Sequence, residues 1–371
     1  MYPCLPAGRL LLVSCIFMPM LKKLYLENFR SHKKISIDLS PVTVFVGPNG
    51  AGKTNILEAL GLLSFCRSFR EENKKNLIQI SAPYCRVICD DLELTMAREP
   101  RLIFKAKKNG TPKPPASFIG ILPSVIISPE TIALISGSPG DRRRFLDIMI
   151  GQEDREYLLA ISSFKKIRYQ RNSLLQRIGK GMANKSELDF WNREFIQTSN
   201  LISSKREEAI KFLDKITPPI YKKISGNEGD QISILYQKNY ENLESTLKQN
   251  EGREIASGSC LFGAHRDDIN INLNNLPMAN FASRGELKSA VLSLKMAELK
   301  FIEEHAKARS KIEEIYEPIL LLDDIFSEFD IKRKAHLVEL IKNYQTFITV
   351  TEEDVLPSNI FDDASIIKVK N

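Results

Sequence analysis

The chain is organised around residues 47–55, which read Gly47-Pro48-Asn49-Gly50-Ala51-Gly52-Lys53-Thr54-Asn55. They match the phosphate-binding pattern G-x-x-x-x-G-K-[ST] at every fixed position. Residues 42–46, before the loop, are apolar or β-branched and predict a buried strand, whereas residues 56–60 favour a helix. The backbone N–H groups of such a loop and of the helix start hold phosphate oxygens. The sequence therefore predicts an α/β fold with a nucleotide site at this loop.

Two residues of the loop are expected to act directly on the nucleotide. Lys53 is expected to reach the β- and γ-phosphates of ATP and to serve catalysis, and the Thr54 hydroxyl to ligate Mg²⁺. All nine residues, from Gly47 to Asn55, are expected to bind the cofactor. ATP and Mg²⁺ are thus the predicted cofactors.

A second apolar run, Ile-Leu-Leu-Leu-Asp-Asp at residues 319–324, ends in two carboxylates. Its four aliphatic residues predict a strand that is buried on both faces. We expect Asp323 to bind Mg²⁺ and Asp324 to be catalytic, orienting or deprotonating the attacking water. The alternative is a strand followed by a solvated turn, which the loop at residues 47–55 disfavours.

The third element is Ser283-Arg284-Gly285-Glu286, which precedes a long helical pattern. Ser283 and Glu286 are spaced as a helix capping box. The same start also presents a hydroxyl, N–H groups and the positive end of a helix dipole, which a second subunit offers to a γ-phosphate. Ser283, Gly285 and Glu286 are therefore expected to bind the cofactor across a dimer.

Composition sets loose limits on the class of protein. Of 371 residues, 43% are hydrophobic and 27% charged, which is typical of a soluble protein of two or three lobes. The 53 Lys and Arg residues exceed the 46 Asp and Glu residues, and the net charge of +7 permits a polyanionic partner without requiring one. Six cysteines occur without a C-x-x-C pair, which indicates reduced core cysteines in a cytoplasmic protein.

Residues 1–19 are unlike the rest of the chain. Arg9 is followed by an apolar run at residues 10–13 and 15–17 that resembles a short signal sequence but is too short to span a bilayer. We predict a start-site extension, disordered or untranslated, with translation beginning at Met18 or Met20. The alternative is a chain lipidated at Cys15.

The pattern along the chain predicts two lobes. Alternation at residues 24–26 and 35–39 predicts strands, strand-like runs fill residues 86–106, and Asn109-Gly110 predicts a hairpin turn. Prolines interrupt regular structure at residues 111–115. Apolar residues at three- and four-residue steps then predict helices at about 152–178 and from 186 to the prolines at 218 and 219. Strands are predicted again at residues 232–236, 346–350 and 366–369.

From these patterns we assign residues 20–115 and 301–371 to an ATPase lobe. Residues 116–300 form a helical second lobe that carries the Ser283 signature at its end. The predicted fold class is α/β, a P-loop head of the ABC-ATPase type with a mixed sheet and helices, plus the helical lobe.

The order of these motifs resembles the ABC-type ATPase heads of chromosome-maintenance and repair proteins. Among them the chain is most similar to the RecF family of bacterial recombination mediators. Ser327 to Asp330 completes the order of the general motifs. The more specific matches are collinear over about residues 20–371: Leu26 to Arg30, Ser128 to Glu130, Gly137 to Asp147, Gly263 to Asp268 and Phe281 to Ser283.

The resemblance implies an ATP-dependent homodimer in which two nucleotides lie between the loop of one chain and the signature of the other. It implies a weak ATPase, coupled to dimerisation and to binding of double-stranded DNA near single-strand gaps. It further implies work with RecR, RecO and RecA in DNA replication, recombination and the SOS response, in the cytoplasm and without a membrane. Asp330 is implied to lie in the loop between the two sites.

The chain departs from the family pattern at four positions. The family usually has Gln at the positions of Arg284 and Glu286, Pro at Ala264 and Leu at Phe329. A guanidinium at residue 284 either strengthens binding across the dimer or is solvated. No histidine occurs at residues 349–351, where transport ATPases place a switch histidine, so Thr349 or Thr351 is expected to take its contact.

Other charged groups have two interpretations each. Arg30 contacts the nucleotide or caps a strand turn, the segment from His265 to Asp268 braces the site or is an internally paired turn, and Arg142 to Arg144 meet phosphate or a local ion network. For DNA we name Lys165, Lys166 and Arg168 on the first long helix. Basic residues fan around this helix, so a solvated face is the alternative.

Two rival functions are considered. One is a transport ATPase subunit, which would need a membrane permease as its partner. The other is a nucleotide-dependent dimer switch with negligible hydrolysis, in which ATP only closes the dimer.

Overall fold

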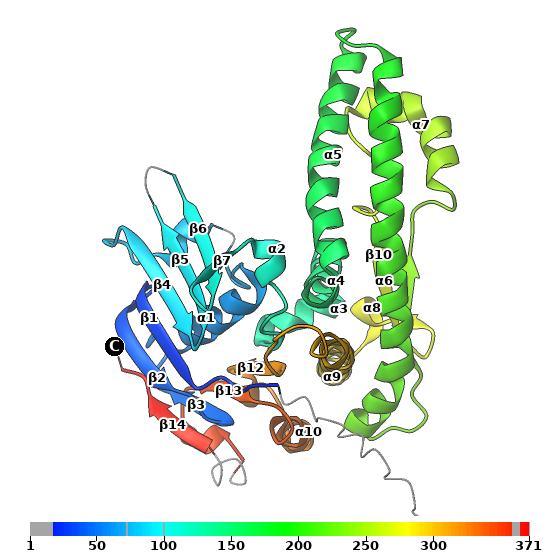
Figure 1. Cartoon of the computed structure of the whole chain (residues 1–371). Helices are drawn as coiled ribbons and strands as arrows, with labels where there is room; N and C mark the ends of the chain where they lie inside the picture. The colour runs from blue at the N-terminus through cyan, green and yellow to red at the C-terminus, as the bar shows by residue number, and fades with distance from the viewer. Residues whose placement is uncertain (1–17, 72, 99–100, 358–363, 371) are drawn as a thin grey trace, which may run out of the picture.

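The computed structural model describes residues 18–71, 73–98, 101–357 and 364–370. Most of the predicted start-site extension therefore lies outside the described residues. The chain forms a head of two sheets, beside which a pair of long helices projects as a separate arm (Figure 1). This arrangement confirms the predicted fold class of a P-loop head with a mixed sheet and helices, plus a helical lobe.

A parallel sheet carries the motif strands. Its order is β14-β3-β13-β12-β8, and all four strand pairs are parallel. The bounds are β3 Val42–Val46, β8 Ser124–Ile127, β12 Ile319–Asp323, β13 Thr346–Val350 and β14 Ala364–Lys368. The carboxyl ends of β3 and β12 therefore lie at one edge, which brings the phosphate loop and Asp323 together.

A second sheet of six antiparallel strands covers one side of the head, in the order β2-β1-β4-β5-β6-β7. Its bounds are β1 Lys23–Phe29, β2 His32–Asp38, β4 Tyr84–Cys89, β5 Leu92–Ala97, β6 Ile103–Lys108 and β7 Thr111–Lys113. The predicted hairpin turn is present at Asn109-Gly110. The predicted break at residues 111–115 is wrong at its start, because Pro112 lies opposite Lys107 on an edge strand, where the missing N–H costs no ladder bond.

Helix α1, Lys53–Phe65, lies between the two sheets and is buried from Ile56 onward. Its apolar residues join one core with alternate residues of the parallel sheet, such as Phe45 and Leu321. The other face, with Leu320 and Leu322, packs on the helices of the second lobe. The aliphatic run before Asp323 is thus buried on both faces, as predicted.

The second lobe is built on long helices. These are α4 Pro139–Glu153, α5 Arg155–Gly179, α6 Leu188–Ser225, α7 Leu243–Ser257 and α9 Arg284–Arg309. A small antiparallel sheet, β11-β10-β9, belongs to the same lobe, with β9 Ile232–Gln237, β10 Asp268–Leu273 and β11 Leu276–Pro277. Helix α10, Ile331–Ile341, follows β12 in the head. The shorter helices are α2 Pro115–Phe118, α3 Ala133–Ser136, α8 Met278–Phe281, η1 Lys74–Leu77, η2 Pro129–Ile132, η3 Lys185–Glu187, η4 Ile325–Ser327 and η5 Glu353–Val355.

Helix α6 does not stop at Pro218 and Pro219, so this predicted boundary is wrong. A proline inside a helix costs about 3 kcal/mol. The next turn buries Ile220, Tyr221 and Ile224 in the core. Burying a side chain of this size contributes about 1.5–3 kcal/mol, so three of them offset the two prolines.

Strand β8 bears on the division into lobes. It lies in the range 116–300 assigned to the second lobe, yet it pairs with β12 in the parallel sheet of the head. We therefore propose that the head continues through Ile127. Helix α9 packs on α6, on α4 and on β8, so it joins the two lobes.

The cysteines and the helices both bear on the class of protein. Cys66, Cys85, Cys89 and Cys260 are free and buried, as expected for core cysteines. In the part of the chain that the structure describes, no helix combines the length and the apolar character needed to cross a membrane.

Candidate nucleotide site and its surroundings

The phosphate loop depends on two glycines for its course. A Cβ on Gly47 would lie 2.3 Å from the carbonyl oxygen of Val369. Gly52, at φ 93°, is the N-cap of α1, and a Cβ there would lie 2.7 Å from Ser31 Oγ. Only glycine fits both the positive φ and the close approach. The first turn of α1 then presents its free N–H groups to the loop.

Lys53 lies over the loop. Its side chain is nearly buried, and Nζ donates to the carbonyl oxygens of Gly47 at 2.6 Å and Pro48 at 3.0 Å. Burial lowers the pKa of Lys53, whereas the charges of Asp324 and Asp323 oppose that shift. An ammonium held in this way is placed to neutralise a phosphate bound by the loop.

The structure brings Thr54 and Asp323 together from 269 residues apart. Thr54 Oγ1 donates to Asp323 Oδ1 at 2.8 Å, and Thr349 Oγ1 donates to the same oxygen at 2.7 Å. Asp323 is 8% exposed. Because the Thr54 hydroxyl donates its hydrogen bond to the carboxylate, its lone pairs remain available to a cation. One hydroxyl and one carboxylate suit Mg²⁺, which keeps several waters and takes few protein ligands.

Asp324 follows directly in the left-handed region, at φ 50°. Its N–H donates to Thr349 Oγ1 at 3.0 Å, so Thr349 bonds to both aspartates. Burial raises the pKa of Asp324, and the neighbouring charge of Asp323 raises it further. A carboxylate with a raised pKa is a better base for a water molecule than an ordinary aspartate.

Most of the predicted loop residues and Asp324 line one cavity of about 210 Å³; among the described residues, Gly47, Pro48, Ala51 and Asp323 are not part of its lining. From the predicted set it is lined by Asn49, Gly50, Gly52, Lys53, Thr54, Asn55 and Asp324. Sequence reasoning missed Arg70 and left open the choice between Thr349 and Thr351. Thr349 lines the cavity and, within the described residues, Thr351 does not.

The turn between β1 and β2 braces the loop from outside. Asn55 Nδ2 donates to Ser31 Oγ at 3.0 Å, and His32 Nε2 donates to the Gly52 carbonyl at 3.0 Å. Arg30 forms a two-bond ion pair with the buried Glu58 of α1, at 2.8 and 2.7 Å. Arg30 therefore ties the turn to α1, which favours the structural interpretation over nucleotide contact.

The predicted signature begins α9. Ser283 and Glu286 form the predicted capping box: the Ser283 N–H donates to Glu286 Oε2 at 2.7 Å, and the Glu286 N–H to Ser283 Oγ at 3.3 Å. Ser283 and Arg284 are exposed. Within the described chain, Ser283, Gly285 and Glu286 do not line the nucleotide cavity of their own molecule.

Arg333 of α10 holds the signature in place, a contact that no sequence pattern indicates. Its guanidinium donates to the Gly285 carbonyl at 2.7 Å and to Ser289 Oγ at 2.9 and 3.0 Å. It also pairs with Asp330, three residues earlier. One side chain thus connects the signature with the Asp330 loop that the family resemblance places between the sites.

The segment from His265 to Asp268 serves the second lobe. Asp267 is buried and accepts from Ser203 Oγ of α6 at 2.7 Å, and Asp268 pairs with Arg142 of α4 at 2.7 Å. The ion network of Arg142 is therefore not local, because its partner is 126 residues away.

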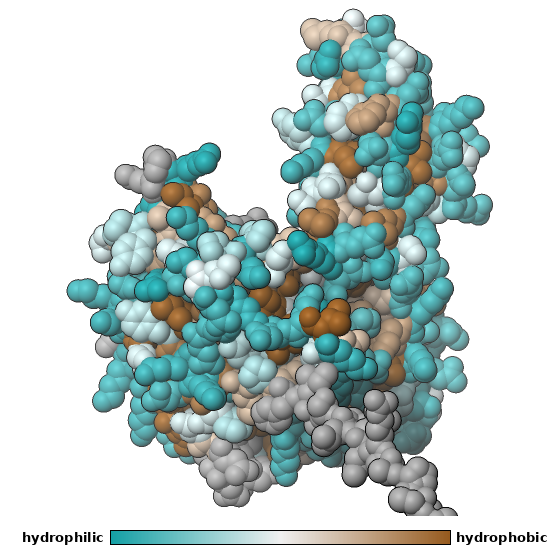
Figure 2. Space-filling view, viewed as in Figure 1, coloured by the Kyte–Doolittle hydropathy of each residue, from teal (hydrophilic) through white to brown (hydrophobic). Residues whose placement is uncertain are grey.

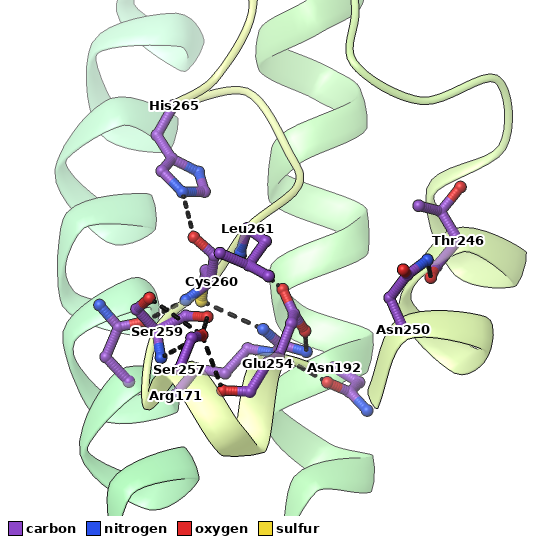
Figure 3. Close-up of polar contacts among 11 residues, drawn as sticks. Arg171, Asn192, Thr246, Asn250, Glu254, Ser257, Ser259, Cys260, Leu261 and His265 are labelled. Carbon is purple, nitrogen blue, oxygen red and sulfur yellow. Dashed lines mark hydrogen bonds and ion pairs between the residues drawn. The ribbon is translucent and has the colours of Figure 1, made fainter. Parts of the chain in front are cut away.

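A buried arginine anchors the preceding loop, as Figure 3 shows. Arg171 of α5 donates to Glu254 Oε2 at 2.6 Å, to Cys260 Sγ at 3.1 Å and to Asn192 Oδ1 at 2.8 Å. His265 Nε2 donates to the Cys260 carbonyl at 3.0 Å. These bonds fix α5, α6 and α7 to one another, so this cluster stabilises the arm.

The three predicted DNA residues differ in their surroundings. Lys165 and Arg168 line a second cavity, of about 440 Å³, that lies between the head and the arm. Lys166 is exposed and, among the described residues, is not part of that lining. The surface of the arm is largely hydrophilic (Figure 2).

The fold and the loop-to-Asp323 cluster define a P-loop ATPase head. A family described as an AAA ATPase domain matches residues 20–365. A DNA replication and repair protein RecF of Staphylococcus haemolyticus is 31% identical over 94% of this chain and 98% of its own length. The RecF of Moorella thermoacetica is 33% identical over 92% of both chains.

Solved structures agree with this. The recombination mediator RecF bound to ATP, described as part of the RecFOR pathway, superposes with a TM-score of 0.83 at 26% identity, covering 94% of this chain and 95% of its own. An Smc head domain from Pyrococcus furiosus, at 19% identity and a TM-score of 0.52, shares the fold. The chain belongs to the RecF family, which confirms the predicted resemblance.

Proposed function

We propose that the chain is an ATP-dependent DNA-binding protein of recombinational repair and replication. The observation that carries this function is one cavity lined by Lys53, Thr54 and Asp324, with Asp323 bonded to Thr54, in a chain of the RecF family. Family membership favours this role over a transport ATPase subunit. The same role implies that the protein works in the cytoplasm, where ATP and the chromosome are available.

The chain's own residues divide the work on ATP. The N–H groups of the loop and the start of α1 bind the phosphates, and Lys53 neutralises their charge. Mg²⁺, when bound by Thr54 and Asp323, supplies further charge neutralisation. Asp324, whose pKa burial raises, orients the water and accepts its proton.

A second copy of the chain completes the site. Ser283, Gly285 and Glu286 start a helix that, among the described residues, contributes nothing to the lining of its own nucleotide cavity; Ser283 is exposed at the positive dipole end. Placed against the γ-phosphate of the other molecule, they bind the nucleotide across the dimer. Each ATP is then shared by two chains, so nucleotide binding closes the dimer.

The dimer binds duplex DNA near single-strand gaps and works with RecR, RecO and RecA, as expected for the family. Lys165 and Arg168 are the better candidates for phosphate contact, because both line the cavity between head and arm. Lys166 points elsewhere on the same helix, so we leave it out of this contact.

ATP hydrolysis measured with and without duplex DNA, alongside light scattering of the purified chain, tests this function. We expect slow hydrolysis that DNA changes, and a mass that doubles when ATP is added. If hydrolysis is undetectable with and without DNA while ATP still doubles the mass, the protein is a dimer switch. If ATP changes neither quantity, the proposed function is wrong.

A further inference from the structure

The cavity between head and arm is lined mainly by cations. Among the residues that the structure describes, seven basic and two acidic side chains line it. The segment after α1 contributes Arg67 and Lys74, α4 contributes Arg143 and Arg144, and α5 contributes Lys165 and Arg168. Both lobes thus direct positive charge at one space, which we call the basic cavity.

The seventh cation, Arg206, is 3% exposed and bonds Asp147 at 2.8 Å. Glu71 accepts from the Asn73 N–H at 2.8 Å and from Asn76 Nδ2 at 2.9 Å, so both carboxylates of the cavity are already engaged. At the rim, Lys165 is exposed. The positive charge consequently runs from the protein surface into the space between the lobes.

These cations repel one another. Burial lowers the pKa of Arg67, and the charge of Arg144 lowers it further. The pKa of Arg143 is lowered by burial and by Arg206, although the charges of nearby aspartates oppose the shift. The pKa of Lys74 is lowered by burial and by Arg67, against the influence of Cys66. An anion bound among them would relieve this repulsion, so the basic cavity is suited to a negatively charged ligand.

The lining also indicates what kind of anion fits. A cavity of about 440 Å³ is large for a free phosphate, and part of its wall is apolar, formed by Ile161, Phe164 and Ile202. A phosphate that carries a sugar on either side would use both the cations and the apolar wall. The exposed Lys165 at the rim then meets the next phosphate along a strand.

The basic cavity is linked to the nucleotide cavity by a short turn. Arg67 and Ser68 line the basic cavity, and Arg70 lines the nucleotide cavity. Ser68 Oγ accepts the N–H groups of Arg70 at 3.0 Å and Glu71 at 2.9 Å, and it donates to the buried Glu58 of α1. Arg144 reaches the Ser68 carbonyl at 3.5 Å. A ligand that moves Arg67 or Arg144 would therefore act on the same turn that carries Arg70.

We propose that the basic cavity binds a backbone phosphate of duplex DNA and that the turn at residues 67–71 couples this phosphate to the nucleotide. This inference rests on the proposed DNA-binding function and adds a site and a route of coupling. Coupling is reciprocal, so DNA raises the affinity for ATP by the same factor as ATP raises the affinity for DNA.

The test uses the full chain, a 30-base-pair duplex and a series of salt concentrations. Lys165→Gln is compared with Lys166→Gln, its neighbour on the same helix outside the cavity. Loss of one phosphate contact lowers the slope of log affinity against log salt by about 0.9 and the affinity by about fivefold at 0.15 M salt. We expect this loss for Lys165→Gln and for Arg67→Gln, and not for Lys166→Gln.

The coupling is read from the DNA affinity with and without ATP. We expect Arg67→Gln to bring the ratio of these affinities toward one, and Lys166→Gln to keep the ratio of the unmodified chain. Melting temperatures check that both variants fold. Equal salt slopes for Lys165→Gln and Lys166→Gln overturn the site, and an unchanged ratio in Arg67→Gln overturns the coupling.

Two further results separate this inference from the proposed function. If the unmodified chain does not bind the duplex at all, the proposed function itself fails. If the duplex binds without using Lys165 while calorimetry detects inorganic phosphate that Arg67→Gln no longer binds, the cavity takes free phosphate, and the assignment to a DNA backbone is wrong.

Discussion

The nucleotide cavity and the signature helix are built in opposite ways. Lys53 of the cavity is nearly buried, and Thr54 and Thr349 both donate to one oxygen of Asp323, which is nearly buried as well. At the signature, Ser283 and Arg284 are exposed, and the capping box satisfies Ser283 and Glu286 within the helix start itself.

This difference indicates that the two elements have different roles in binding the nucleotide. Buried hydrogen-bonded groups hold their geometry before a ligand arrives, so the cavity is a preorganised phosphate site. The signature is equally well held, by Arg333, but it faces solvent. A rigid element with an exposed polar end is suited to contact a second molecule. We therefore propose that the phosphate loop of one chain and the signature of the other form each site.

Removing the central cation of the cavity has the largest expected effect. Lys53→Ala removes a buried charge beside the phosphates, and hydrogen bonds to charged groups contribute about 1.5–3 kcal/mol each. We expect ATP affinity to fall about 100-fold and ATP-dependent dimerisation to be lost, measured with a fluorescent ATP analogue and by light scattering. Lys34→Ala, on an exposed lysine of β2, is the matched control. A Lys53→Ala chain that still dimerises with ATP would contradict the division of the site.

Asp324→Asn separates binding from turnover. The amide keeps the shape of the side chain but cannot accept the proton of water, so hydrolysis should fall by about 100-fold or more. ATP binding remains, and we therefore expect an ATP-bound dimer that persists on DNA. Unchanged turnover, measured by phosphate release, would show that another group activates the water.

The pH dependence of hydrolysis reports the same carboxylate. Burial and Asp323 raise the pKa of Asp324 above the usual range for aspartate. The base must be ionised, so activity is present above this pKa and falls about tenfold per pH unit below it. We expect the acid limb of the rate at saturating ATP to lie at a higher pH than an ordinary aspartate gives. A limb at the ordinary position would contradict the raised pKa of Asp324.

Arg333→Ala tests the signature without changing any of its residues. Loss of the bonds to Gly285 and Ser289 releases the start of α9 from the Asp330 loop. Because the lost hydrogen bonds contribute about 1–1.5 kcal/mol net, we expect ATP-dependent dimerisation to weaken about tenfold. Binding of ATP to the single chain, in contrast, should stay as it was. Lys332→Ala, on the neighbouring exposed residue, serves as the control.

The smallest effect is expected at the unusual residue of the signature. Arg284 is exposed, and an exposed ion pair contributes about 0–1 kcal/mol. Arg284→Gln, which restores the usual family residue, should change ATP-dependent dimerisation by less than about fivefold. A larger loss in sedimentation or light scattering would mean that the guanidinium is buried against the other chain.

The sequence predicted the local parts of this account. The phosphate loop, the strand that ends at Asp323 and the capping box at Ser283 each occupy a few consecutive residues, so their patterns are visible without a structure. Family membership is visible for the same reason, because the matching segments are collinear along the chain.

What the sequence did not reveal depends on residues that are distant in the chain. Three features follow from how the lobes pack. These are the Arg142 to Asp268 ion pair, the hydrogen bond from Arg333 to Gly285 and the cavity that Arg67 and Lys165 both line. The helix through Pro218 and Pro219 also depends on packing, because burial of the next turn outweighs local propensity. The pairing of β8 with β12 was not visible either, because the two strands are far apart along the chain.

The central claim is that each site is shared by two chains, and a mixing experiment tests it most directly. Lys53→Ala lacks the phosphate half, and Ser283→Arg blocks the signature half. Each variant alone should be inactive. Mixed in equal amounts, they can form a dimer with one complete site, so the account predicts that ATP hydrolysis returns. A mixture no more active than the two variants measured separately would contradict it.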